Sequence, residues 1–344
     1  MSQRLTNILG YLTLIAILGA IWVMFGEDPA RDQGARGEAT FDGLSDRVND
    51  AAAITISQNG VNTRLNKVKG NWYVIERDGY PADRATVHDF LRGLALSERR
   101  EPKTANEERF DKLGLGDNAL DIKVLDGDDS AIAAFEMGTR KDSPNGRSLT
   151  YIFQEQDTRS WLVSGLTETS ADPAWWLDTN VLDIAESRFE SVAYGDVTIS
   201  RALGDDKYTI EDLAEGEAMQ ADWQLRDPAR VLSNLNLDDV RKIANPITDP
   251  LAVVRVATYD GLRLTVTLYN LENATWAQIA ARHDSALADA GEGGVLPDAP
   301  MDGEAEAETI NERTHGWLFK LSDYDAKVLM RGRADFLESK TDEE

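Results

Sequence analysis

Residues 53–75, AITISQNGVNTRLNKVKGNWYVI, decide the fold class that the sequence predicts. Apolar and polar side chains alternate on both sides of Asn59-Gly60, and an Asn-Gly pair between two such runs is a strong β-hairpin signal. A third alternating run, Asn71 to Ile75, follows Lys69-Gly70. The stretch therefore predicts a three-stranded antiparallel meander.

An amphipathic helix is expected directly after the meander. Pro81-Ala82-Asp83 supplies a helix start with Asp83 as the N-cap, and Pro102 supplies a stop. Further alternating strands follow, so we expect an α+β module over residues 52–166. The helix's apolar residues recur at close to helical spacing: Val87, Phe90, Leu91, Leu94 and Leu96.

The order of elements repeats in residues 194–331, which predict a second α+β module. We expect each module to be a mostly antiparallel sheet with one packed helix. In the second module the helix should start near Asp227-Pro228. The matched segments are residues 54–57 with 197–200, residues 72–74 with 223–225 as strands, and helices that end at Pro102 and Pro246.

Four other segments complete the expected domain plan. Residues 27–51 are small, charged and Gly-rich and predict a flexible linker. Residues 283–315 are rich in Ala, Gly, Asp and Glu, so they predict a mobile acidic loop inserted in the second module. Residues 167–193 form a connector, and residues 332–344 form a charged tail.

The N-terminal residues 1–26 predict a transmembrane signal anchor. Residues 5–26 contain no Asp, Glu, Lys, Arg or His, and about 20 apolar residues span a bilayer as a helix. Arg4 before this run and acidic residues after it favour a cytoplasmic N-terminus. A cleaved signal peptide is the alternative, although its apolar region is usually shorter. The anchor positions that should meet lipid are Leu5, Ile8, Leu12, Ile15, Trp22 and Phe25.

Composition excludes several classes of function. The chain has 36 Lys and Arg against 61 Asp and Glu, a formal net charge of -25, which argues against a nucleic-acid partner. The sequence has no Cys, which removes disulfides, thiol nucleophiles and a lipid-modified cysteine.

No motif predicts an enzyme, a cofactor or a metal site. The sequence lacks phosphate-binding glycine loops, its three His stand far apart, and Ser164 lacks the preceding Gly of a nucleophile elbow. Asp126-Gly127-Asp128-Asp129-Ser130 resembles the start of a calcium loop, but a hairpin turn with an acidic tip explains it better.

Three aromatic residues are candidates for contact with a partner: Tyr80, Trp175 and Trp176. Exposed aromatic side chains near turns favour interfaces. For the two adjacent tryptophans the alternative is packing of both rings between the modules, because large aromatic rings also dominate cores.

Five motifs of the chain carry a family resemblance: Trp72-Tyr73-Val74, Gly79-Tyr80-Pro81-Ala82-Asp83, Lys112-Leu113-Gly114-Leu115, Trp161-Leu162-Val163-Ser164-Gly165 and Asp172-Pro173-Ala174-Trp175-Trp176-Leu177-Asp178. Together they resemble a bacterial family named domain of unknown function 4340, most densely from about Ala52 to Val192. The resemblance implies an accessory role beside an ABC transporter of the gliding-motility type, with a permease and an ATPase as partners, and it supplies no active-site residues.

The expected function is that of a non-catalytic subunit or scaffold, held in the bacterial inner membrane by a single span with its body in the periplasm. A stand-alone envelope module that binds a glycan, peptide or lipid is the alternative. An envelope hydrolase with a carboxylate pair is a third class, for which no motif places a nucleophile beside a base.

Overall fold

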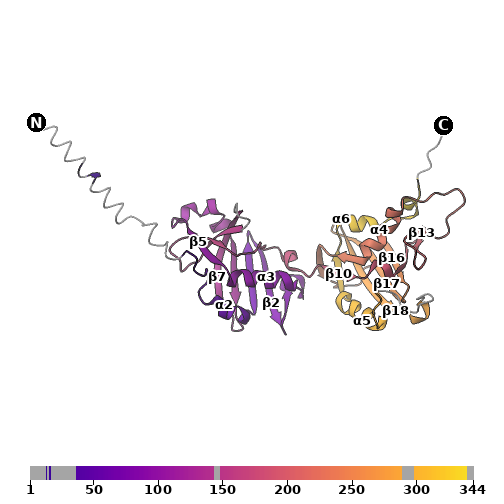
Figure 1. Cartoon of the computed structure of the whole chain (residues 1–344), viewed down its shortest axis with the longest axis horizontal. Helices are drawn as coiled ribbons and strands as arrows, with labels where there is room; N and C mark the ends of the chain where they lie inside the picture. Colours follow the sequence, from indigo (N-terminus) through magenta and orange to yellow (C-terminus); the bar gives the residue numbers. More distant parts are fainter. Residues whose placement is uncertain (1–12, 14, 17–35, 143–147, 289–297, 339–344) are drawn as a thin grey trace, which may run out of the picture. The chain divides into compact units, whose positions relative to one another are not determined.

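The structure, a computed structural model, describes residues 13, 15–16, 36–142, 148–288 and 298–338 (Figure 1). The contacts between residues divide the chain into two units, residues 1–76 with 81–176 and residues 77–80 with 177–344. The predicted membrane anchor lies outside the described residues except at Ile15 and two neighbouring positions. Within the described ranges, no helix has the length and apolar character needed to cross a membrane.

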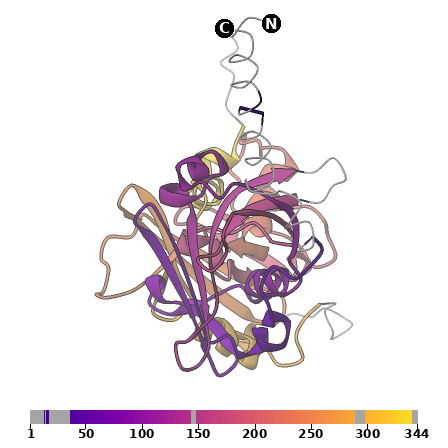
Figure 2. The ribbon, with the colours of Figure 1, turned by 90° about the vertical axis from the view of Figure 1, so that its left-hand side faces the viewer.

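The first unit contains a nine-stranded sheet in the order β4-β3-β2-β1-β6-β7-β8-β9-β5. Helix α3 lies against this sheet (Figures 1 and 2). The strands are β1 (Ala53–Gln58), β2 (Val61–Val68), β3 (Asn71–Val74), β4 (Tyr80–Pro81), β5 (Glu98–Pro102), β6 (Leu120–Leu125), β7 (Ala131–Asp142), β8 (Ser148–Phe153) and β9 (Trp161–Ser164). The helices are α2 (Leu44–Arg47), α3 (Arg84–Ala95) and the short 3-10 helices η2 (Val48–Asp50), η3 (Ile75–Arg77), η4 (Glu107–Leu113), η5 (Gly116–Asn118) and η6 (Pro173–Trp176).

The meander and the start of its following helix are confirmed. The predicted helix end is wrong, because α3 ends at Ala95 and residues Glu98–Pro102 form strand β5. β1 pairs antiparallel with β2, and the turn between them places Asn59 at φ 51° and Gly60 at φ 82°, the left-handed conformations that a tight hairpin turn requires. The Asp83 carboxylate accepts a hydrogen bond from the Thr86 N–H at 2.7 Å, so Asp83 caps α3 as expected. Leu96 is a correction, because it follows the helix and exposes 61% of its surface.

The expected flexible linker is wrong for its described part. Ala39 forms a β-bridge with Glu98, and the Thr40 N–H donates to the Ser97 carbonyl at 2.9 Å. Phe41 is buried, with its ring centroid 4.8 Å from that of Phe135. Burial of this aromatic ring fastens the segment to the first unit although its composition is that of a spacer.

The second unit contains an eight-stranded sheet in the order β13-β12-β11-β16-β17-β18-β19-β15 and a two-stranded sheet of β10 and β14. The strands are β10 (Asn180–Asp183), β11 (Phe189–Ala193), β12 (Thr198–Ser200), β13 (Thr209–Ile210), β14 (Asn234–Asn236), β15 (Asp239–Lys242), β16 (Ala252–Thr258), β17 (Leu262–Leu271), β18 (Ala274–His283) and β19 (Trp317–Lys320). The helices are α4 (Asp222–Ser233), α5 (Gly303–Thr314), α6 (Asp323–Leu329) and the 3-10 helices η7 (Glu186–Arg188), η8 (Ser285–Leu287) and η10 (Arg333–Phe336). The described chain is thus a mixed fold of antiparallel sheets and a few helices.

The residue-level match between the two halves is wrong in the region of α4. Residues 223–225 belong to the first turn of this helix rather than to a strand. The helix ends at Ser233, well before Pro246, and β15 lies between them. A helix therefore occupies the place where the sequence predicts both a strand and a helix start.

The acidic insertion also differs from the expected mobile loop, since its described end forms helix α5. This helix lies beside β18 (Figure 1). The Asn311 side chain accepts from the Ala281 N–H at 2.9 Å and donates to the Ala281 carbonyl at 2.7 Å. Asp302 caps the helix by accepting from two backbone N–H groups. These contacts hold the helix although its own sequence is acidic and has Ile310 as its one large aliphatic residue.

Candidate functional site

The three aromatic residues predicted as partner contacts differ in exposure. Trp175 exposes 44% of its surface, whereas Tyr80 exposes 2% and Trp176 is fully buried at 0%. Tyr80 begins the edge strand β4, but its contacts assign it to the second unit. Its ring packs edge-on against that of Trp317, with 5.1 Å between the ring centroids, and burial raises the pKa of its phenol. The expected exposure is wrong for Tyr80 and Trp176, because both rings complete apolar packing. Trp175 keeps the exposure that a docking residue needs.

Trp176 fastens the turn that presents Trp175, residues 171–176, which we call the Trp175 turn. Its indole Nε1 donates to the Ser170 carbonyl at 2.9 Å, and its ring meets Phe90 of α3 edge-to-face with 5.5 Å between centroids. The Trp176 carbonyl accepts from the Asp83 N–H at 2.7 Å. Trp176 therefore contacts the first turns of α3 through both its backbone and its ring.

The other end of the same turn is also fixed. The Thr63 hydroxyl, itself buried, donates to the Ala171 carbonyl at 2.7 Å. The Asp172 carboxylate accepts from the Ala174 N–H at 2.9 Å and so closes the turn that leads into η6. Because these bonds already order the backbone, a partner that binds the Trp175 ring has little ordering entropy to overcome.

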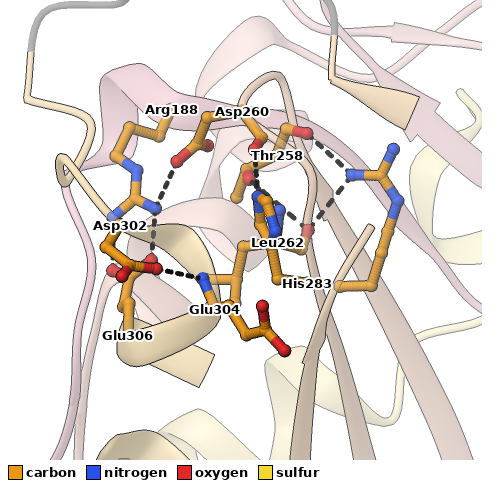
Figure 3. Close-up of polar contacts among 9 residues, drawn as sticks. Arg188, Thr258, Asp260, Leu262, His283, Asp302, Glu304 and Glu306 are labelled. Carbon is orange, nitrogen blue, oxygen red and sulfur yellow. Dashed lines mark hydrogen bonds and ion pairs between the residues drawn. The ribbon is translucent and has the colours of Figure 1, made fainter. Parts of the chain in front are cut away.

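The most deeply buried ion pairs of the second unit surround Arg188, which exposes 3% of its side chain (Figure 3). Its guanidinium donates to both Glu306 carboxylate oxygens at 2.6 and 2.7 Å and to Asp260 Oδ2 at 2.6 Å. We call Arg188, Asp260 and Glu306 the Arg188 clamp. It joins the end of η7, the turn between β16 and β17, and helix α5.

The electrostatics of the Arg188 clamp keep Arg188 and Asp260 charged. Burial acts to raise the pKa of Asp260, but hydrogen bonds from Arg188 and Thr258 outweigh it and lower that pKa. Burial likewise opposes the charge on Arg188, yet the hydrogen bonds to Glu306 and Asp260 raise its pKa. An ionised carboxylate bound to a guanidinium is a poor general acid, so this cluster is suited to holding structure rather than to proton transfer.

The residues around the clamp support that interpretation. His283 Nε2 lies 2.9 Å from the Asp260 carbonyl oxygen (Figure 3). A Cβ at Gly303 would lie 2.4 Å from His283 Cδ2, so the first turn of α5 sits directly on the imidazole ring. The arrangement attaches α5 to the end of the sheet.

A second candidate site is a cleft of about 340 Å³ between α4 and α6, which we call the α4–α6 cleft. Trp223 and Tyr324 stand at it with exposures of 60% and 50%. Sequence reasoning missed this site because it placed Trp223 in a strand. The lining residues are Glu186, Trp223, Arg226, Asp227, Arg230 and Tyr324.

Helix α4 contains a proline, and a distant arginine compensates for the helical hydrogen bond that this proline removes. Pro228 has no N–H, so the Gln224 carbonyl loses its helical partner. Arg331 donates to that carbonyl at 3.1 Å and to the buried Asp227 carboxylate at 3.3 Å. The same helix face then presents Trp223 and Arg230, which share helical spacing with Asp227.

This compensation makes a testable prediction. Arg331→Leu should lower the free energy of unfolding by about 2 kcal/mol, because it leaves the Gln224 carbonyl and the Asp227 carboxylate without this donor. Pro228→Ala restores an N–H for Gln224, so it should raise stability more in the Arg331→Leu background than in the wild type. Urea unfolding of the four proteins measures this coupling, and strictly additive effects would contradict it.

The Asp126 cluster is a hairpin turn. β6 pairs antiparallel with β7, and Asp126 Oδ1 accepts from the N–H groups of Asp128 and Ser130 at 3.0 and 2.9 Å. Ser164 ends β9, and its hydroxyl accepts from Arg100 Nε at 2.8 Å. In the described part of the chain, no group of three or more His, Asp or Glu side chains is placed to hold a metal ion.

Comparison with known proteins finds one family. The model of the family described as Domain of unknown function (DUF4340) matches residues 72–259, which is more than half of the chain and includes the Trp175 turn, α4 and Arg188. Neither the curated proteins nor the solved structures gave a match.

Proposed function

We propose, from the premise that this chain belongs to the DUF4340 family, that it is a non-catalytic accessory or scaffold subunit of a membrane transport system. Its role in this proposal is to bind another protein. Both carboxylates of the Arg188 clamp are paired with a guanidinium, which leaves them committed to structure rather than to acid-base chemistry.

The Trp175 turn is the observation that carries this proposal. Tryptophan is enriched among the residues that dominate binding energy at protein interfaces, and a rigid backbone lowers the cost of using it. Here the neighbouring Trp176 is buried and hydrogen-bonded, while Trp175 exposes 44% of its surface. An exposed indole on a fixed turn is suited to insertion into a pocket of a partner protein.

The proposed partners are the permease and ATPase subunits of an ABC transporter, the association that the family resemblance implies. The proposed attachment is the apolar segment of residues 5–26, with the N-terminus in the cytoplasm and the body in the periplasm of a bacterial inner membrane. Under this topology the Trp175 turn would meet an extracytoplasmic surface of the permease.

We also propose that the two units are copies of one module. The two strand orders support this when β1, β2 and β3 are matched with β11, β12 and β13. The four strands β6 to β9 then correspond to β16 to β19, and the edge strand β5 corresponds to β15. Helices α3 and α4 occupy the same place in the two chain orders, and each has 12 residues. A scaffold with two such units offers two separate surfaces.

Affinity purification tests the proposed function. The full-length chain, solubilised mildly from its native membrane, should retain an ABC permease and ATPase that mass spectrometry identifies. Trp175→Ala should reduce their recovery about tenfold or more, since hot-spot truncations cost at least about 2 kcal/mol. Trp223→Ala is the matched control, because it also removes an exposed indole but lies on α4. Equal recovery with all three proteins, or no transporter subunit with any, would reject the proposal.

A further inference from the structure

The α4–α6 cleft combines aromatic rings with a balanced set of charges. Of its six lining residues, Arg226 and Arg230 are cationic and Glu186 and Asp227 are anionic. The remaining two are Trp223 and Tyr324, and no aliphatic side chain lines the cleft. The site therefore offers ring faces, hydrogen-bond donors and hydrogen-bond acceptors. Its six lining residues carry no formal net charge, and Asp227 is also bound by Arg331 from outside the lining.

The balance of charge selects against a charged ligand. A phosphate or carboxylate brought to the arginines would also approach Glu186 and Asp227, and a cation would meet the two guanidiniums. Arg226 is already paired with Glu186 at 2.6 Å through Nε, the one guanidinium atom that its described hydrogen bond uses. Its two outer amino groups can then donate to a ligand in the fixed planar geometry of the guanidinium.

The exposed rings select for a ligand with apolar C–H faces. Trp223 and Tyr324 remain 60% and 50% exposed, so a large part of each ring meets solvent. Aromatic rings have an electron-rich face that attracts the positive edges of C–H groups. A sugar ring presents such C–H groups on its faces, while each of its hydroxyls both donates and accepts hydrogen bonds.

We propose that the α4–α6 cleft is a binding site for a neutral saccharide. One sugar ring stacks on Trp223 or Tyr324, while Arg226 and Arg230 donate to its hydroxyl oxygens and the Glu186 carboxylate accepts from its hydroxyl protons. The volume of about 340 Å³ is near the lower end for ligand sites, about 300 Å³, so the cleft takes a short part of a glycan chain. The rest of that chain would stay in solvent.

The same residue types also occur at protein interfaces, but the composition of the cleft favours a sugar. Binding hot spots lie in desolvated pockets whose centre is apolar and depleted of charge. Here four of the six lining residues are charged, and Arg226 and Arg230 keep 48% and 64% of their side chains exposed. This site does not depend on the proposed docking of Trp175, since the two tryptophans lie in different units.

The test uses the full-length chain in a detergent without a sugar headgroup. The probes are maltoheptaose, cellohexaose and a hexamer of N-acetylglucosamine, titrated to millimolar concentration by calorimetry. At least one probe should bind saturably, and Trp223→Ala and Tyr324→Ala should each weaken that binding about tenfold or more. Trp223→Phe should keep most of the affinity because it keeps a ring, and Trp175→Ala should leave it unchanged.

Two outcomes overturn the assignment. The first is that none of the three probes binds the wild type, and the second is that Trp223→Ala and Tyr324→Ala bind as tightly as the wild type. Loss of co-purifying membrane proteins with Trp223→Ala, without saccharide binding by the wild type, would instead identify the cleft as a protein contact. Circular dichroism of each variant ensures that a lost signal does not come from unfolding.

Discussion

Arg188→Met should lower the free energy of unfolding by about 3 kcal/mol. Removing one member of a buried ion pair typically costs about 3–5 kcal/mol, because the remaining charge stays desolvated without its partner. Here two carboxylates, Asp260 and Glu306, would be left facing each other. Their side chains keep 14% and 19% exposure, which places the expected cost at the lower end of that range.

The matched control is Arg226→Met. Arg226 pairs with Glu186 at the same 2.6 Å distance, but its side chain is 48% exposed, against 3% for Arg188. Exposed ion pairs contribute about 0–1 kcal/mol, so this variant should stay within about 1 kcal/mol of the wild type. If Arg188→Met and Arg226→Met lowered the free energy of unfolding equally, burial would not be the reason why the Arg188 clamp stabilises the fold.

The Arg188→Met substitution should also destabilise one helix, α5, more than the rest of the chain. Because Glu306 belongs to α5, amide hydrogen exchange in residues 303–314 should accelerate strongly in Arg188→Met. Exchange in α3 of the first unit should not change. Unaltered protection of α5 would mean that its contacts with β18 are sufficient without the clamp.

The clamp also predicts a dependence on pH. The folded pKa of Asp260 lies below its ordinary value of 3.8, so its contribution to stability is fully present above pH 3.8. That contribution is lost as the pH falls through the lower folded value. The stability difference between wild type and Arg188→Met should therefore shrink below pH 3.8, and urea unfolding at several acidic pH values measures it. If this stability difference stayed constant with pH, the ionisation of Asp260 would not contribute to the stability that the Arg188 clamp provides.

Local signals were sufficient for the meander and for the start of α3. The Asn59-Gly60 turn and the Asp83 cap act on residues within a few positions, so their effect is visible in the sequence alone. The family membership followed from motifs in the same half, and the matched region extends to residue 259.

The sequence-based errors lie where distant residues determine the local structure. Asp227-Pro228 looks like a helix start, but α4 begins at Asp222 and keeps its internal proline because Arg331 serves the Gln224 carbonyl. The loop prediction for residues 283–315 gave weight to their acidic charge and overlooked the Ala and Glu residues of α5, which favour a helix. This helix is held by Arg188, 118 positions earlier in the chain. With 61 acidic residues, nothing in the sequence distinguishes the carboxylates that reach these arginines.

The candidate sites, too, could be predicted only where local sequence signals were sufficient. Trp175 could be named from its motif, although only the structure separates its exposed ring from the buried ring of Trp176. The α4–α6 cleft combines residues from η7, α4 and α6, whose approach depends on tertiary packing. A strand assignment for Trp223 placed its side chain in a sheet and so removed it from consideration.

Trp176→Ala is expected to cost about 4 kcal/mol, the largest loss among the variants considered. The indole is fully buried, and truncation of a buried Trp or Phe to Ala typically costs about 3–5 kcal/mol, because the lost burial adds to the cost of the cavity. The Ser170 carbonyl also loses its donor at 2.9 Å. Trp175→Ala, one residue earlier and 44% exposed, should change stability by less than about 1 kcal/mol.

A double-mutant cycle tests whether the contact with Phe90 contributes to this loss. The two rings meet edge-to-face at 5.5 Å, a geometry that adds about 0.5–1.5 kcal/mol beyond burial. Trp176→Ala and Phe90→Ala should therefore cost less together than the sum of the single effects, by about 1 kcal/mol. Urea unfolding of the full-length chain gives all four values. Additive losses would mean that each ring packs on different neighbours.

Comparison of Trp176→Ala with Trp175→Ala distinguishes an effect on folding from an effect on docking. Because Trp176 fixes the turn, Trp176→Ala should lose both stability and the recovery of transporter subunits, whereas Trp175→Ala should lose recovery alone. Trp176→Phe keeps a buried ring but not the donor to Ser170, so it should keep part of both properties. If Trp176→Ala retained full partner recovery, the rigid turn would not be what presents Trp175, and the docking surface would lie elsewhere on the chain.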